Sequence, residues 1–340
     1  MLTLLILLQI AAPPTPPSTQ RPAPLTRFLE QSIGLTAQQL AAAERGEPVV
    51  KVLETQDRRD VALFGIITVP LAREQYVRTL RDFPTSLRTS NRAQLGIFSD
   101  PAVASDVAAV TVTSRDVSEM KDCKPGDCVV KLPATDMQRI QEQVNWSAPD
   151  VQTQLSAYAR RRLVEYVTDY RSRGDSAMAR YDDRGNVTVH SSEAFAAQLA
   201  ESPYVYQTVP SLRSYFVNYP RGLLPSGAAE IVYWSEDALP RLRPILSVTH
   251  LVVYTPPELP GMTVVAAKQI YANHYFEAAV DLTAAVERGP ESLYLVVLRR
   301  YRFDNLPGGI LNIRGKAIGA LRDQLVLDLR RQQTAGEQAR

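Results

Sequence analysis

Residues that could carry out chemistry are few in this sequence, and they lie far apart. The three histidines are His190, His250 and His274. The sequence has no Gly-x-Ser-x-Gly elbow, no His-Glu-x-x-His pair and no glycine-rich loop of the kind that holds phosphate. Gly308-Gly309 precedes a helical stretch but lacks the rest of a dinucleotide-binding motif. We therefore predict no catalytic residues, no cofactor and no metal site, and a binding protein is favoured over an enzyme.

The only two cysteines, Cys123 and Cys128, lie on either side of a Pro-Gly turn. Such a turn brings its flanking residues together, so the two side chains could reach bonding distance. A metal site would need two more ligands, and the closest histidine in the sequence is His190. A redox-active pair more usually has the spacing Cys-x-x-Cys. The favoured interpretation is a small structural disulfide, which also favours an oxidising compartment.

Polar side chains interrupt strand faces that are otherwise apolar. If residues 263–282 form one strand, the even positions share a face that is apolar except for Lys268 and His274. His250 interrupts the preceding strand in the same way. Such groups could orient a ligand inside an apolar cavity, although internal hydrogen bonding is the more favoured role for both histidines. The candidate cavity-lining residues are Trp234, His250, Lys268, Ile270, His274, Phe276, Arg299 and Tyr301.

The elements that position these residues are three apolar runs and a helix near the C-terminus. The runs cover residues 245–255, 263–282 and 292–303, and turns containing proline and glycine separate them. This pattern is typical of an antiparallel meander. The last run is apolar on both faces, so we expect both of its faces to be covered. An amphipathic stretch over 310–332 then predicts a helix that packs on the sheet.

The N-terminal half supplies further elements of the same domain. Residues 48–55 and 61–69 indicate a strand pair, and residues 71–83 indicate an amphipathic helix. Residues 84–228 predict a largely helical insertion, whose longest helix covers 151–173. The sequence therefore predicts an α+β fold. In this fold a curved antiparallel sheet wraps around the long C-terminal helix, with an apolar cavity between them.

Composition and the N-terminus bear on the compartment. The chain has 340 residues and a net charge of +2, without the basic field expected of a nucleic-acid-binding protein. Residues 2–12 form an apolar core of signal-peptide length, too short to span a bilayer, and the following residues are rich in proline. No lysine or arginine precedes this core, so a disordered start is the alternative. We predict that residues 1–24 are a signal-like segment and linker, that 25–340 form one domain, and that the protein is periplasmic or extracellular without a transmembrane span.

This arrangement resembles the helix-grip proteins of the START-like, or SRPBCC, superfamily. The first strand pair ends in Ile66-Ile67-Thr68-Val69-Pro70 and leads into an amphipathic helix with Asp82 near its end. The later strands and the long helix after Leu306-Pro307-Gly308-Gly309 match the end of such domains. Residues 84–228 depart from the family because they are far longer than the usual connection. The resemblance implies a ligand class, namely sterols, phospholipids or aromatic polyketides.

Three hypotheses about function follow. The leading one is binding or transport of a hydrophobic or amphipathic, lipid-like small molecule, a role compatible with peripheral contact to a membrane. The second is an enzyme of the same fold, a cyclase or hydrolase, with His274 and Lys268 as acid and base groups that meet in an open cavity. The third is a structural envelope protein without a ligand, which exposes the aromatic residues between 204 and 219 as an adhesive patch.

Overall fold

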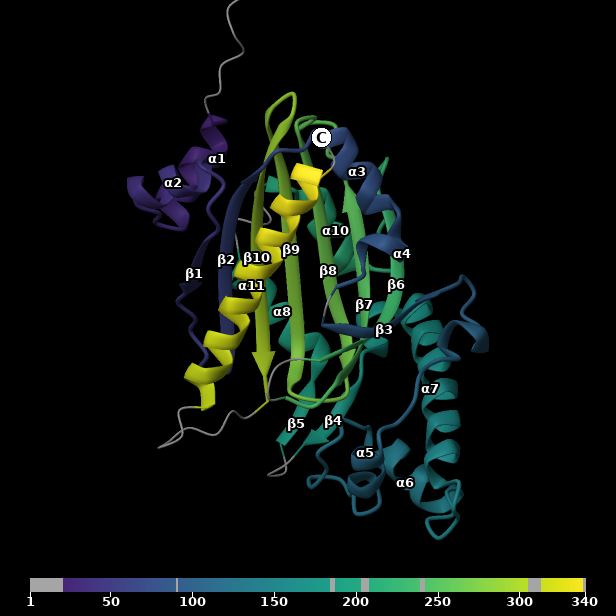
Figure 1. Ribbon diagram of the computed structural model, residues 1–340. Coiled ribbons are helices and arrows are strands. Elements are labelled where there is room, and N and C mark those ends of the chain that lie inside the picture. The colour runs from purple at the N-terminus through teal and green to yellow at the C-terminus, as the bar shows by residue number, and fades with distance from the viewer. Residues whose placement is uncertain are drawn as a thin grey trace, which may run out of the picture.

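The described part of the chain is centred on one open antiparallel sheet of eight strands (Figure 1). The computed structural model describes residues 21–338 except 90, 184–186, 203–207, 239–241 and 305–312, and nearly all of the signal-like segment lies outside these residues. The predicted α+β class is confirmed. From one edge to the other, the strands are β1 (Val49–Leu53), β2 (Asp60–Val69), β10 (Ser292–Phe303), β9 (Phe276–Gly289), β8 (Met262–Ala272), β7 (Ile245–Tyr254), β6 (Ala229–Asp237) and β3 (Arg92–Phe98).

The run 263–282, which the sequence predicts to be one strand, contains a turn between β8 and β9. In this turn Tyr275 has a φ of 62°, in the left-handed region that few side chains adopt. Just after the turn, Phe303 pairs with Phe276 whereas Arg302 pairs with Ala278, which leaves Glu277 as a bulge. The predicted alternation of faces is therefore wrong from Ala272 to Phe276, but it holds again from Ala278 to Leu282, which share a face with Lys268 as predicted. The turn and the bulge place Phe276 on the opposite face from Ala278.

The long C-terminal helix α11 (Ile313–Gln338) lies across one face of the sheet, as predicted (Figure 1). Leu325 and Leu329 lie one turn apart on the helix, so they point to the same side, and both are buried against β2. Gly65 of β2 allows this close approach, because a Cβ atom there would lie 3.1 Å from each leucine side chain. The helix is thus seated on the sheet by leucines that meet a glycine.

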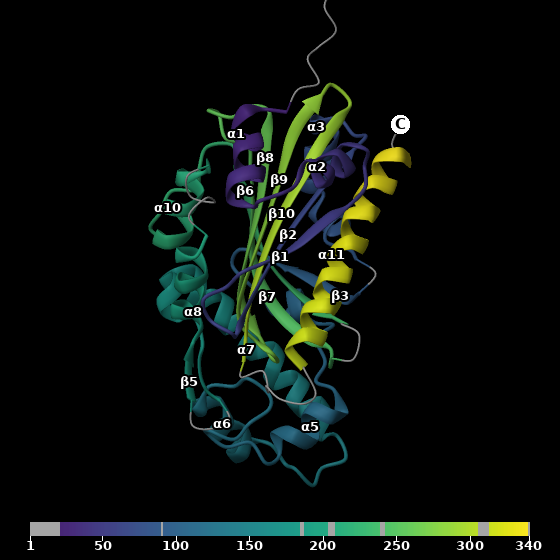
Figure 2. The ribbon, with the colours of Figure 1, turned by 90° about the vertical axis from the view of Figure 1, so that its left-hand side faces the viewer.

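Shorter helices cover the rest of the sheet. Two of them, α3 (Arg73–Arg81) and α4 (Phe83–Ser86), lie on the same face as α11. Figure 2 shows α8 and α10 on the side away from α11. That opposite face packs against helices from two distant parts of the chain. They are α1 (Ala23–Arg27), the π-helix η1 (Phe28–Ser32), α2 (Ala37–Glu44), α8 (Ser191–Ala200) and α10 (Pro210–Asn218).

The predicted insertion, residues 84–228, is largely helical and also supplies β3 to the sheet edge. Its longest helix, α7, spans Val151–Arg173 as predicted. Cys123 and Cys128 form the predicted disulfide, with Cα atoms 4.6 Å apart. The other elements of the insertion are η2 (Ala104–Val107), α5 (Ser114–Met120), α6 (Ala134–Gln143), η3 (Gly174–Ala177), β4 (Arg180–Asp183) and β5 (Val187–His190).

Candidate ligand-binding cavities

A cavity of about 230 Å³ lies between the sheet and α11, and we call it the sheet–helix cavity. The helix contributes Leu321, Gln324 and Asp328 to its wall. The floor is a row of side chains that pair across neighbouring strands, so the register of the sheet fixes their positions. From β10 to β6, this row is Tyr301, Ala279, Gln269, Thr249 and Tyr233.

A charged group lines the wall of the sheet–helix cavity. Arg299 of β10 donates from Nε to Asp281 and from Nη1 to Asp328, each over 2.7 Å. Asp281 is its partner on the adjacent strand β9, whereas Asp328 comes from α11. Burial alone would lower the pKa of Arg299, but these carboxylates raise it overall. The cavity therefore contains a guanidinium that stays charged and has further N–H donors.

The same cavity contains a buried acceptor without a partner. The Oε1 atom of Gln269 is buried, and no hydrogen bond reaches it from any described residue. An ion pair between Arg92 and Asp237, at 2.9 Å, lines another part of the wall. Burial raises the pKa of Tyr301 to about 12, so its hydroxyl remains protonated at neutral pH. The lining is thus amphipathic, whereas the sequence predicts an apolar one.

The structure does not bring the eight candidate residues together. Three of them line the sheet–helix cavity, namely Phe276, Arg299 and Tyr301. Four lie on the opposite face, where Trp234 and Ile270 pack against α7 and where His250 pairs with Lys268 across β7 and β8. The eighth, His274, lies in the turn after β8. Strand alternation explains the division, because Gln269 faces α11 and its neighbours on either side face away from it.

His250 is fully buried and has a hydrogen-bond partner for each ring nitrogen. Its Nε2 lies 2.8 Å from Glu230 and its Nδ1 lies 2.9 Å from the hydroxyl of Tyr170. Because a carboxylate only accepts, Nε2 donates to Glu230 and the tyrosine hydroxyl donates to Nδ1. Burial lowers the pKa of His250, and Glu230 only partly opposes this effect. His250 is therefore neutral, and both of its ring nitrogens are hydrogen-bonded within the protein. This arrangement fits the structural role that the sequence favours.

Lys268 and His274, the acid and base groups of the enzyme hypothesis, lie in separate surroundings. Lys268 is buried, donates to Asp175 and lies 4.0 Å from the ring centre of Phe195. Burial lowers the pKa of Lys268, and Asp175 opposes that shift. The space beside it is only about 30 Å³, enough for a water molecule but not for a substrate. This geometry gives no support to a joint catalytic role.

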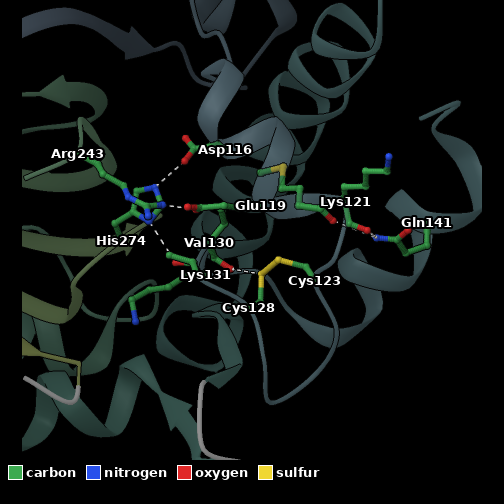
Figure 3. Close-up of a disulfide and its surroundings, with 12 residues drawn as sticks. Asp116, Glu119, Lys121, Cys123, Cys128, Val130, Lys131, Gln141, Arg243 and His274 are labelled. Atoms are coloured by element: carbon green, nitrogen blue, oxygen red, sulfur yellow. Dashed lines mark hydrogen bonds and ion pairs between the residues drawn. A yellow bond between two sulfur atoms is a disulfide. The ribbon is translucent and has the colours of Figure 1, made fainter. Parts of the chain in front are cut away.

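Figure 3 shows His274 between α5 and the loop that carries the disulfide. Its Nε2 lies 3.1 Å from Asp116, and its Nδ1 donates to the carbonyl oxygen of Val129 over 3.2 Å. Nearby, Arg243 forms an ion pair with Glu119 of the same helix. The histidine thus ties the insertion to the end of the sheet, which is again a structural role.

The aromatic segment between residues 204 and 219 is largely packed inside the protein. Tyr215 and Phe216 are buried, and Tyr219 is half-buried. Their rings surround His250, with the Tyr219 ring centre 4.8 Å from the imidazole. Tyr204 and Tyr206 lie outside the described residues. The described aromatic residues therefore do not form the exposed adhesive patch of the third hypothesis.

A second pocket, of about 370 Å³, lies on the sheet face opposite α11, and we call it the apolar pocket. Its floor centres on Ala284 of β9, which pairs with Val296 of β10 and with Val264 of β8. The sequence predicts no site here. The sequence feature that points to this pocket is the second apolar face of the run 292–303, which contains Val296 and Leu298.

Among the described residues, no group of three or more His, Cys, Asp or Glu side chains is placed to hold a metal ion. The described helices also include none that is both long and apolar enough to cross a membrane. No protein-family model matches the chain, and a comparison with curated proteins finds no match.

Proposed function

We propose that this protein binds a small amphipathic molecule in the sheet–helix cavity. The observation that carries the proposal is Gln269, in the middle of the cavity floor, whose buried Oε1 atom has no hydrogen-bond partner among the described residues. A buried acceptor without a hydrogen bond costs about 1–3 kcal/mol. A hydroxyl or N–H group of a ligand that reached this atom, between Thr249 and Ala279 on the floor, would offset this cost.

The lining supports a particular class of ligand. Phe276 and Tyr301, whose ring centres are 5.4 Å apart, offer an aromatic wall to an apolar ring. Arg299 pairs with two carboxylates, Asp281 and Asp328, and Arg331 also lies 3.5 Å from Asp328, so the charges of this group balance. The volume of about 230 Å³ is below the roughly 300–1,000 Å³ usual for drug-sized ligands. We therefore propose a compact ring compound with hydroxyl or amide groups and without a net charge.

The arrangement of elements supports the proposed kinship with helix-grip proteins. The chain runs from β2 through α3 and α4 to β3, and β6 to β10 then lead to the closing helix α11. β2 returns to lie beside β10 in the sheet. The resemblance to the START-like superfamily implies that a ligand binds between the sheet and this last helix. The sheet–helix cavity lies in that position. Membership in that superfamily remains part of the proposal.

We propose further that the protein works outside the cytoplasm. The disulfide between Cys123 and Cys128 supports this, because such bonds persist in oxidising compartments. The apolar core at residues 2–12 has signal-peptide length. Detection of the mature N-terminus in a periplasmic or secreted fraction would test this part separately from ligand binding.

The experiment compares two variants of one strand. In Ala279→Trp, the indole should fill the sheet–helix cavity between Tyr301 and Gln269. In the control Ala284→Trp, the same side chain points to the opposite face. We expect solvent extraction and mass spectrometry to recover a compact hydroxyl- or amide-bearing compound from the wild-type protein and from the control, but not from Ala279→Trp. Identical extracts from all three proteins would contradict the proposal.

A further inference from the structure

We infer that the apolar pocket is a second ligand site, and that it takes a single-chain amphiphile with a cationic head. This site does not rest on the sheet–helix cavity, because the two are separated by the sheet itself. On β9, for example, Asp281 lines the cavity while its neighbour Leu282 lines the pocket. The two sites therefore use different side chains and can be blocked independently.

The floor of the apolar pocket has the shape and chemistry for an alkyl chain. Residues of β9 form its central line, with a β10 partner on one side and a β8 partner on the other. Each of these cross-strand rows is apolar where it lines the pocket. At about 370 Å³, the volume falls within the usual range for small-molecule sites. The floor residues are Met262, Val264, Leu282, Ala284, Val296 and Leu298.

The walls of the apolar pocket come from segments that are far apart in the sequence. Leu25 of α1 and Phe28 of η1 form one wall, and Val209, just before α10, contributes to the other. Leu259, in the turn between β7 and β8, lines one end. These segments leave a gap over β8, β9 and β10 rather than meeting each other. An elongated apolar group that lies along the strands would fill this gap and remove its lining from water.

The charged residues of the apolar pocket are both acidic. They are Glu258 and Glu287, and neither lysine nor arginine is among the described residues that line it. Both glutamates are exposed, but Glu287 pairs across the strands with Leu293, whose side chain faces α11, so Glu258 supplies most of the charge at the rim of the pocket. Glu287 lies 3.6 Å from Arg73, whereas no ion pair joins Glu258 to another described residue. A cationic head at this rim would meet an opposite charge, and an anionic head would be repelled.

The test uses N-phenyl-naphthylamine, a neutral dye whose fluorescence rises in apolar surroundings. Dodecylammonium and dodecanoate, which share a chain and differ in charge, then compete with the dye below their micelle-forming concentrations. For the full-length wild-type protein we expect bound dye, and displacement by dodecylammonium at roughly fivefold lower concentration than by dodecanoate. No bound dye, or equal displacement by the two amphiphiles, would overturn the inference.

Three variants locate the dye and the charge preference. Ala284→Trp fills the floor between Val296 and Val264 and should weaken dye binding at least tenfold, whereas Ala279→Trp, on the other face, should leave it unchanged. The reverse result would place the dye in the sheet–helix cavity and overturn the inference. Glu258→Lys changes only an exposed rim residue and should fold normally. It therefore tests the charge preference of the apolar pocket even if Ala284→Trp does not fold. It should reduce the preference for dodecylammonium about threefold, and an unchanged preference would contradict the proposed rim.

Discussion

Adjacent residues of a single strand belong to two sites of different chemistry. On β10, Leu298 lines the apolar pocket and Arg299 lines the sheet–helix cavity. On β9, Leu282 and Asp281 are divided in the same way. Because successive side chains of a strand point to opposite faces, one residue step is enough to change from a hydrocarbon surface to a charged one. The sheet thus separates two sites that could bind unlike ligands at once.

The two faces also differ in what covers them. A single long helix, α11, covers the sheet–helix cavity and contributes Asp328 to its charge network. The apolar pocket is instead walled by segments that are far apart in sequence, such as Leu25 and Val209. We expect the helix-covered face to lose more stability when a single residue is changed, because one continuous element carries its packing and its charges.

The largest expected effect on stability comes from weakening the packing of α11 against the sheet. Leu325 is fully buried against Gly65 of β2, so Leu325→Ala should lower the free energy of unfolding by about 3–4 kcal/mol through lost burial and a residual cavity. Leu327, on the same helix, is 49% exposed, and Leu327→Ala should cost about 1 kcal/mol or less. Urea unfolding of the two variants measures the difference. Equal losses would show that the leucine stripe does not hold the helix in place.

The second prediction compares substitutions of the neighbouring residues Leu298 and Arg299, which lie on opposite faces of the sheet. Arg299→Leu leaves Asp281 and Asp328 without their shared cation, and we expect a loss of about 2–3 kcal/mol in the free energy of unfolding because the site is partly solvated. Leu298→Ala removes a half-buried side chain at the edge of a pocket and should cost about 1 kcal/mol. Chemical unfolding curves with equal slopes would give both values. If Leu298→Ala proves less stable than Arg299→Leu, the face covered by α11 is not the more sensitive of the two.

Most of the fold could be predicted from residues that act locally. The turns around residues 256–261 and 289–292 do separate the apolar runs, and α7 spans the predicted 151–173. The sequence does not reveal the turn inside 263–282, because this turn lacks proline and glycine. It depends instead on Tyr275 in a left-handed conformation, and on the side chain of Asn273, which accepts a hydrogen bond from the backbone of Leu246. Sequence alternation cannot reveal a turn that tertiary contacts hold.

The sites were harder to predict than the elements. Three of the candidate residues line the sheet–helix cavity, but Gln269 and Asp328 were not among the candidates because their roles depend on register and on α11. Lys268 and His250 stand out in the sequence as polar residues on an apolar face. In the structure they interact with Asp175, Glu230 and Tyr170, which lie far away in the chain. A sequence shows which polar residue is unusual, but not which partner satisfies it.

The third prediction concerns acid sensitivity on the face away from α11. Burial lowers the pKa of His250 below its ordinary value of 6.5, so below that pH the unfolded chain binds a proton that the folded protein does not. The stabilising contribution is complete above about pH 6.5 and is lost as the pH falls, by up to about 1.4 kcal/mol per pH unit. We expect His250→Gln, although less stable at neutral pH, to show a shallower decline between about pH 6.5 and 5. Unfolding curves across this range test it, and parallel declines in the two proteins would contradict the prediction.

The smallest expected effect has the opposite sign and bears most directly on function. Gln269→Leu removes a buried acceptor that no described residue satisfies and keeps a side chain of similar volume on the cavity floor. Without ligand, the variant should be more stable than the wild-type protein by about 1 kcal/mol, because the desolvated oxygen is gone. The same variant should bind the ligand of the sheet–helix cavity roughly tenfold more weakly and leave dye binding in the apolar pocket unchanged. A gain in stability together with a loss of affinity is the result expected of a residue that serves binding rather than folding. A variant that is less stable than the wild-type protein would show that Gln269 is structural and would remove the main support for the proposed site.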